Sequence, residues 1–65
     1  MSNYYEGTQW KVTDYGIEQR DGWYHIPMRD LDQEMGEGGW IGHMSHKVWV
    51  DIDDFRRAFE IARAR

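Results

Sequence analysis

The chain has 65 residues and four Trp, four Tyr, two Phe and no Cys. A protein this short forms one small domain, residues 1–65. Large aromatic side chains must supply most of its buried area, because no disulfide stabilises it. The net charge of −4 argues against direct nucleic-acid binding, since affinity for phosphates comes mainly from Lys and Arg.

The charges are unevenly distributed along the chain. Residues 1–54 hold eleven acids against four bases, whereas residues 55–65 hold four bases against one acid. The acidic part would be attracted to a positively charged surface of another protein. A net charge of this size is also ordinary for the solubility of a small domain. The balance alone leaves both interpretations open.

No basic segment followed by an apolar run begins the sequence, and no apolar run approaches the roughly 20 residues that span a bilayer. We therefore expect a cytoplasmic protein with no membrane partner.

The first predicted elements form a hairpin. Trp10–Val12 opens a strand, Asp14–Gly16 holds a bulge or bend, and Ile17–Arg20 continues the same strand. Asp21-Gly22 predicts a tight turn, because Gly adopts positive φ at little cost and Asp tolerates it. Trp23–Ile26 is then the return strand.

Pro27 ends this strand because it has no N–H to donate. Met28, Leu31 and Met35 fit one face of a short helix that Gly36 would terminate, and we favour this interpretation. In the alternative, residues 28–35 are extended. Three carboxylates would then lie on one side at about twice the phosphate spacing of one DNA strand, namely Asp30, Asp32 and Glu34.

Residues 37–46 are predicted to be a glycine-rich connector and a loop or weak strand, in which Trp40 and Ile41 anchor to the core. Lys47–Val50 is predicted to be a short buried strand. Asp51 is the expected N-cap of a helix that runs to the C-terminus.

The C-terminal helix has the clearest pattern in the chain. Ile52, Phe55, Phe59 and Ala62 recur at 3-4-3 spacing and give one apolar face. Acids in the first turn and arginines in the last oppose the helix dipole at both ends. Capping is therefore the simplest explanation of the acidic start of this helix, and partner binding is the other.

These elements predict an α+β fold. A small antiparallel sheet of about three strands, made of the hairpin and a third strand, is covered by the C-terminal helix, with a short helix in the middle. The predicted core consists of Val12, Ile17, Tyr24, Ile26, Leu31, Val48, Val50, Phe55, Phe59 and Ala62.

The sequence favours a binding protein over an enzyme. Neither serine lies in a nucleophile motif, the Gly36–Gly39 segment lacks the residues of a phosphate-binding loop, and a small sheet with one helix leaves little room for a pocket. His43, His46 and Asp51 could hold zinc, but glycines precede the pair and the third ligand is a guess. We expect no cofactor and no metal.

Two kinds of side chain are candidates for partner binding. The acidic candidates have few basic neighbours in sequence: Asp30, Asp32, Glu34, Glu37, Asp51, Asp53 and Asp54. The aromatic candidates are Trp49 and Trp23. Trp49 is out of phase with Val48 and Val50, so we expect it on the sheet face away from the helix, where it serves either packing or contact.

Three segments carry a resemblance to a known class of proteins: Trp10–Glu18, His25–Pro27 and Val48–Phe55. With them the chain resembles small anti-CRISPR proteins of phages and mobile elements, and is most similar to inhibitors of the type I-C effector complex. No functional residue is carried over, because anti-CRISPR proteins share no common motif.

The resemblance implies a monomeric acidic inhibitor in the cytoplasm of a bacterial host cell. Its partner would be a DNA-binding subunit of a CRISPR effector complex, and it would block target DNA binding as a DNA mimic. Charge reversal of Asp30, Asp32 and Glu34 together would weaken such binding most. The alternative is a generic interaction module, or a subunit of a larger complex, that uses an exposed aromatic patch and is insensitive to salt.

Overall fold

A computed structural model describes residues 5–64 and confirms the α+β fold. Four antiparallel strands lie in chain order in one sheet. The strands are β1 (Tyr5–Glu6), β2 (Trp10–Val12), β3 (Gly16–Gln19) and β4 (His25–Pro27). A 3-10 turn, η1 (Met28–Asp30), and two helices follow, α1 (Gly39–Met44) and α2 (Ile52–Arg63).

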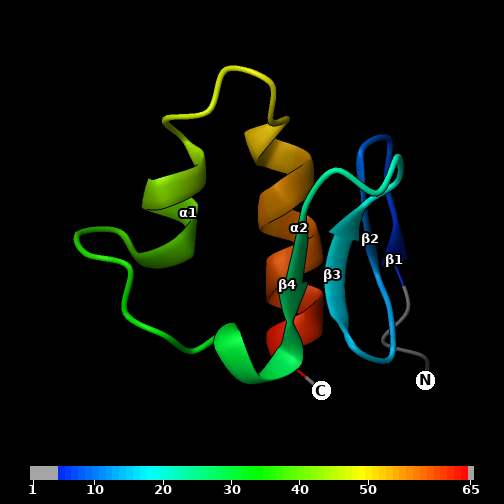
Figure 1. The fold of residues 1–65 in the computed structure, drawn as a ribbon, viewed down its shortest axis with the longest axis horizontal. Helices are drawn as coiled ribbons and strands as arrows, with labels where there is room; N and C mark the ends of the chain where they lie inside the picture. The colour runs from blue at the N-terminus through cyan, green and yellow to red at the C-terminus, as the bar shows by residue number, and fades with distance from the viewer. Residues whose placement is uncertain (1–4, 65) are drawn as a thin grey trace.

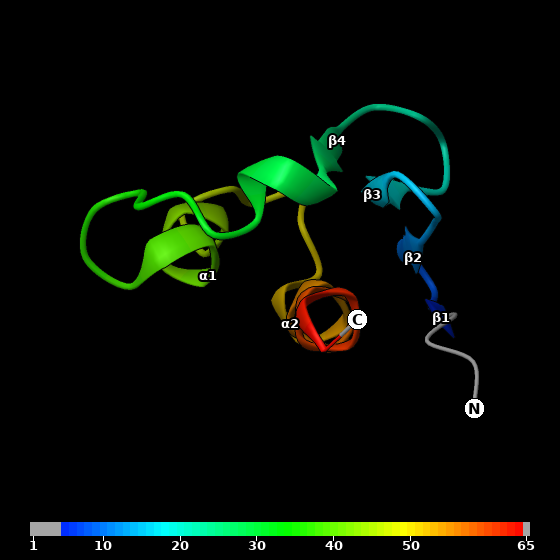
Figure 2. The same ribbon diagram turned by 90° about the horizontal axis from the view of Figure 1, so that it is seen from below.

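The helix α2 lies at the centre of the molecule, between the sheet and α1 (Figure 1). Seen along the axis of α2, the strands form an arc around it (Figure 2). One face of the sheet therefore packs on α2. The short helix α1 packs on the side of α2 away from the sheet.

The two faces of the sheet differ because side chains alternate along each strand. Val12, Ile17 and Ile26 are cross-strand partners, and all three are buried on the face toward α2. The next row is Lys11, Glu18 and His25 on the outer face. There the carboxylate of Glu18 forms a salt bridge with Lys11 at 3.4 Å and lies 3.7 Å from His25. The outer face is therefore charged, with its charges paired.

The core confirms most of the predicted positions. Its buried apolar residues are Trp10, Val12, Ile17, Ile26, Leu31, Trp40, Met44, Phe55, Ala58, Phe59 and Ala62. Tyr24 and Val50 are half-buried against this cluster, whereas Val48 is fully exposed. The core prediction was therefore wrong for Val48 and omitted two large residues, Trp10 and Met44, whereas the expected anchoring of Trp40 to the core is confirmed.

The single bent strand predicted for residues 10–20 is in fact two strands, β2 and β3. Thr13 closes the turn between them, because its N–H donates to the carbonyl of Gly16 at 2.7 Å. Its hydroxyl also accepts from the N–H groups of Tyr15 and Gly16, at 3.1 and 3.2 Å. The bend was correctly located, but these local hydrogen bonds turn the chain back on itself.

The strand predicted at Lys47–Val50 is also wrong. Lys47 N–H donates to Met44 at 2.9 Å, and Val50 N–H donates to Lys47 at 3.1 Å, so the segment is a pair of turns between α1 and α2. The preceding residues, predicted as a loop or weak strand, form α1, which buries Trp40 and Met44. An apolar run of only three residues, Val48–Val50, does not by itself distinguish a strand from other structures, and packing with the rest of the chain determines the outcome.

The middle segment matches neither interpretation fully. Pro27 precedes a single 3-10 turn, Met28–Asp30, and Leu31 N–H donates to Met28 at 3.2 Å. Turns and bends follow in place of a helix that extends to Met35. The helix prediction is therefore correct only in its first turn.

Gly16, in β3, should tolerate an added side chain less well than Gly22 in the β3–β4 turn. Its φ of 154° favours glycine, and an added Cβ would lie 2.0 Å from the carbonyl oxygen of Ile26. Gly22 has φ of 79° but nothing near its missing Cβ. We expect Gly16→Ala to cost about 3 kcal/mol and Gly22→Ala about 1 kcal/mol in urea unfolding. Equal losses would show that the carbonyl contact is unimportant.

Candidate functional site: an aromatic groove

One acidic candidate, Asp54, is part of the structure's interior. Its side chain is buried and accepts from the backbone N–H of Gln9 at 2.9 Å and of Trp10 at 2.6 Å. It also accepts from the hydroxyl of Tyr5. The assignment of Asp54 to a partner-binding surface was therefore wrong, because this carboxylate joins α2 to the β1–β2 turn.

Asp51 acts as the predicted N-cap, since its carboxylate accepts from Asp54 N–H at 3.2 Å. Gln9 then fixes the segment that leads into α2. Its Oε1 accepts from Asp51 N–H at 2.5 Å, and its Nε2 donates to the carbonyl of Trp49 at 2.6 Å. The side chain of Gln9, next to β2, therefore hydrogen-bonds the backbone on either side of the turn that carries Trp49 into α2.

The pKa of the Asp54 carboxyl is lower than its usual value. Burial would raise the pKa of this carboxyl, but hydrogen bonds from Tyr5 and from the backbone of residues 8–10 outweigh it and lower the pKa below its usual 3.8. The unfolded chain then binds more protons than the folded chain as pH falls through 3.8. The stabilisation is complete above that pH and is lost below it.

A Tyr5→Phe variant tests this pH dependence. Loss of the phenol should raise the pKa of Asp54 toward its ordinary value and reduce the acid dependence of the unfolding free energy. The carbon-13 shift of the Asp54 carboxyl against pH measures the first effect, and urea unfolding at several pH values measures the second. An unchanged titration of Asp54 would contradict this account of its hydrogen bonds.

The remaining acidic candidates occupy several parts of the surface. Asp30 lies in η1, 3.8 Å from Arg29, and accepts from Gln33 at 3.3 Å. Asp32 pairs with Arg63 at 3.1 Å. These acids are therefore partly neutralised. They come from η1 and the turn after it, so the extended row of carboxylates considered for residues 30–34 does not form.

The other exposed acids lie in the loop before α1 and at the start of α2. Glu34 and Glu37 are exposed on the loop. Asp53 is exposed in the first turn of α2 and lies 3.8 Å from Arg56.

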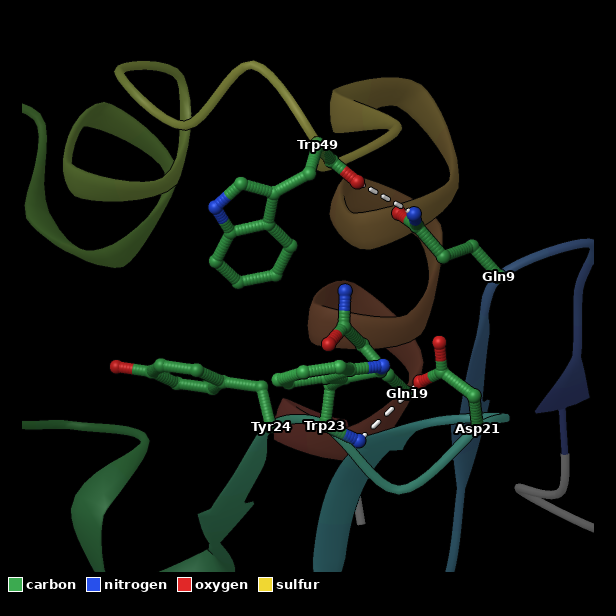
Figure 3. Close-up of a pocket in the computed structure, with 6 residues that line it drawn as sticks. All are labelled: Gln9, Gln19, Asp21, Trp23, Tyr24 and Trp49. Atoms are coloured by element: carbon green, nitrogen blue, oxygen red, sulfur yellow. Dashed lines mark hydrogen bonds between the residues drawn. The ribbon is translucent and has the colours of Figure 1, made fainter.

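The two aromatic candidates, by contrast, meet at one groove. It encloses about 530 Å³ and is lined by Gln9, Gln19, Asp21, Trp23, Tyr24 and Trp49. Figure 3 shows Trp49 on one side, at the segment before α2, and the rings of Trp23 and Tyr24 on the other, at the β3–β4 turn. Trp23 is 79% exposed and Trp49 is 47% exposed. Both aromatic candidates are therefore exposed, but the expected position of Trp49 on the sheet face away from the helix was wrong, because Trp49 lies in the turns before α2 and not in a strand.

Tyr24 connects the groove to the core. Its ring lies 6.1 Å from that of Trp49 and 6.3 Å from that of the buried Trp10. Trp10 in turn contacts Phe55 edge-to-face at 4.9 Å, and Phe55 stacks on Phe59 at 5.9 Å. A continuous series of rings thus runs from α2 to the surface and supports one wall of the groove.

The three residues considered as zinc ligands, His43, His46 and Asp51, do not form a cluster. Among residues 5–64, no three His, Cys, Asp or Glu side chains come close enough together to hold a metal ion. His43 lies on α1 and packs edge-on against Trp40 at 5.8 Å.

No protein-family model matches the chain, and no curated protein or solved structure is significantly similar to it. None of the helices formed by residues 5–64 has the length and apolar character needed to cross a bilayer.

Sequence reasoning found Trp23 and Trp49 but missed the rest of the groove. Asp21 and Tyr24 flank Trp23 in sequence, so the predicted turn could have indicated them. Gln9 and Gln19 carried no such signal. Gln19 lies opposite Trp10 in the sheet, and it lines the groove together with Trp49, which is distant from it in sequence.

Proposed function

We propose that this chain is a non-catalytic inhibitor that binds a positively charged surface of a partner protein. The partner we favour, on the resemblance to anti-CRISPR proteins, is the DNA-recognition surface of a type I CRISPR effector complex. Target DNA would then be excluded because the inhibitor occupies its binding surface.

One observation carries the proposal: two exposed tryptophans converge on a groove that also holds an acid. Exposed tryptophan is costly to solvate, and tryptophans near the centre of a contact surface supply much of the binding energy in protein complexes. Of the described residues that line this groove, Asp21 alone is charged. The groove therefore combines apolar anchors with a negative edge, which suits a basic partner.

The net charge of −4 supports the same partner, because it favours encounter with a basic surface. Mimicry of DNA by a regular row of carboxylates is less well supported, since Asp30 and Asp32 are paired with arginines. In this proposal the acids steer the encounter, and the aromatic groove makes the central contact.

The test is target DNA binding by a purified type I-C effector complex in the presence of increasing amounts of the chain. We expect DNA binding to fall as the chain is added, and inhibition to weaken as salt rises from about 50 to 300 mM, because salt screens the attraction. DNA binding that is unaffected by excess chain would refute the proposed partner.

A second candidate function is an interaction module with a largely apolar contact. The aromatic lining of the groove favours it, and Trp23, Tyr24 and Trp49 would then bury against a neutral surface. Such binding would be insensitive to salt, whereas the inhibitor proposed above would not be. The salt series therefore separates the two functions.

The charge-reversal variant at residues 30–34 should have a smaller effect than loss of the groove. Asp30→Lys, Asp32→Lys and Glu34→Lys together remove negative charge and two surface ion pairs, each worth at most about 1 kcal/mol. We expect slower association and a several-fold weaker inhibition. If this triple variant loses more inhibition than a variant lacking Trp23 and Trp49, residues 30–34 are the main contact.

A further inference from the structure

We infer that the groove between Trp23, Tyr24 and Trp49 binds the guanidinium group of an arginine on the partner protein. The inference rests on the proposed function, in that it names the side chain that the groove would recognise on a basic surface.

The lining has an acid without a matching base. Asp21 accepts from Trp23 N–H at 3.1 Å through one carboxylate oxygen, and no base among residues 5–64 forms an ion pair with it. The neighbouring base, Arg20, is engaged by residues of β1 and the β1–β2 turn. It lies 3.5 Å from Glu6 and donates to the carbonyl of Gly7 at 3.2 Å. The carboxylate of Asp21 can therefore form an ion pair with a cationic group of another molecule.

The aromatic rings suit a cation. The faces of Trp and Tyr attract a guanidinium or ammonium group within about 6 Å of the ring centre. The same chain already uses this contact once, where Arg63 lies 5.5 Å from the centre of the Phe59 ring. Trp23 is more exposed than Phe59, so its face is available to a partner.

Gln19 adds a hydrogen-bonding group without a partner. Its side chain lines the groove, the residue is only 2% exposed, and its Oε1 is buried with no donor. The amide can turn about its last bond, because the oxygen and the nitrogen are similar in size. Turning places the amide oxygen toward the groove, where it can accept from a ligand with N–H donors, and leaves the amide nitrogen in the inner position.

An arginine fits these features better than the other common groups. Its plane stacks on an indole while its five N–H donors reach more than one acceptor. A lysine ammonium has the charge but no plane to stack. A proline-rich peptide stacks well on aromatic residues, but proline brings no N–H donor to Asp21 or Gln19.

The experiment is an NMR titration of the full nitrogen-15-labelled chain with N-acetyl-arginine-methylamide. The matched probes are the lysine and citrulline derivatives, citrulline having the shape of arginine without its charge. We expect arginine to shift the indole signals of Trp23 and Trp49 saturably, lysine to bind several-fold more weakly, and citrulline to leave them in place. The buried Trp40 indole, which donates to Asp30 at 2.8 Å, is the internal reference.

Two variants locate the contact. Asp21→Asn should weaken arginine binding about two- to fivefold, as expected for an exposed ion pair, whereas Glu37→Gln should not change it. Gln19→Met should also weaken it while leaving the fold at least as stable, because a buried unpartnered group is removed. Equal shifts with all three probes, or no shift with arginine, would overturn the inference.

The titration uses the chain without any effector complex, so the two proposals fail separately. A chain that binds arginine but does not affect target DNA binding refutes the proposed partner alone. A chain that inhibits DNA binding but shows no arginine-specific shift refutes the arginine site alone.

Discussion

Asp54→Ala is expected to leave most of the chain unfolded at room temperature. The substitution removes the acceptor for Gln9 N–H, Trp10 N–H and the Tyr5 hydroxyl, and it leaves the buried Trp10 N–H unpaired. Each hydrogen bond to a charged group contributes about 1.5–3 kcal/mol, whereas a domain this small has only about 3–5 kcal/mol of stability from its core. Circular dichroism with urea unfolding measures the effect.

Asp53→Ala is the matched control for this variant. Asp53 is the preceding residue on α2, is exposed, and lies 3.8 Å from Arg56 as a surface pair. Its loss should cost no more than about 1 kcal/mol. If Asp54→Ala is as stable as Asp53→Ala, Asp54 does not join α2 to the sheet, and its carboxylate is free to act as a partner-binding acid.

Trp23→Ala and Trp49→Ala together are expected to weaken inhibition of the effector complex roughly 1,000-fold, because central tryptophans contribute about 2 kcal/mol each to an interface and about 1.4 kcal/mol is a tenfold change in affinity. The fold should tolerate the change, since Trp23 is largely exposed and Trp49 is about half exposed. Titrating the double variant against target DNA binding by the effector measures the loss, and its urea midpoint checks the fold.

The control for the tryptophan pair is Tyr15→Ala with Val48→Ala. Both residues are exposed and large, and Val48 is the neighbour of Trp49 in sequence, but neither lines the groove. This control should inhibit as well as the unchanged chain. Similar losses in both double variants would mean that the groove has no special part in binding.

The parts of the fold that the sequence predicted well depend on contacts close along the chain. Asp51 caps the helix that follows it, the apolar spacing of Phe55 and Phe59 defines its buried face, and Asp21-Gly22 makes the β3–β4 turn. Each of these signals is complete within a few residues, so no knowledge of the rest of the molecule was needed.

The errors arose where distant residues decide the structure. Val48 and Val50 suggested a strand, but so short a segment forms a strand only beside a partner strand. Trp40 and Met44 of α1 fill the core instead. Asp54 looked like one more surface acid at a helix start. Its true role depends on the Gln9–Trp10 backbone, more than forty positions away in sequence.

The groove, too, could be predicted only in part, because residues distant in sequence form it. Its tryptophans could be identified as candidates because they fell outside the predicted core. The roles of Gln9 and Gln19 depend on contacts between β2, β3 and the segment before α2. Gln9 hydrogen-bonds the backbone of Trp49 and Asp51, and Gln19 lines the groove. The acids were the weaker guide, because arginines distant in sequence, such as Arg63 beside Asp32, neutralise some of them.

Hydroxyl-radical footprinting of the chain bound to the type I-C effector complex asks whether the groove is buried in the complex. Mass spectrometry would compare oxidation of Trp23 and Trp49 in the free and bound states, with the exposed Tyr15 as reference. Protection of both tryptophans, with Tyr15 oxidised as before, is the predicted result. Tryptophans that stay as reactive in the complex as in the free chain would place the contact elsewhere on the molecule.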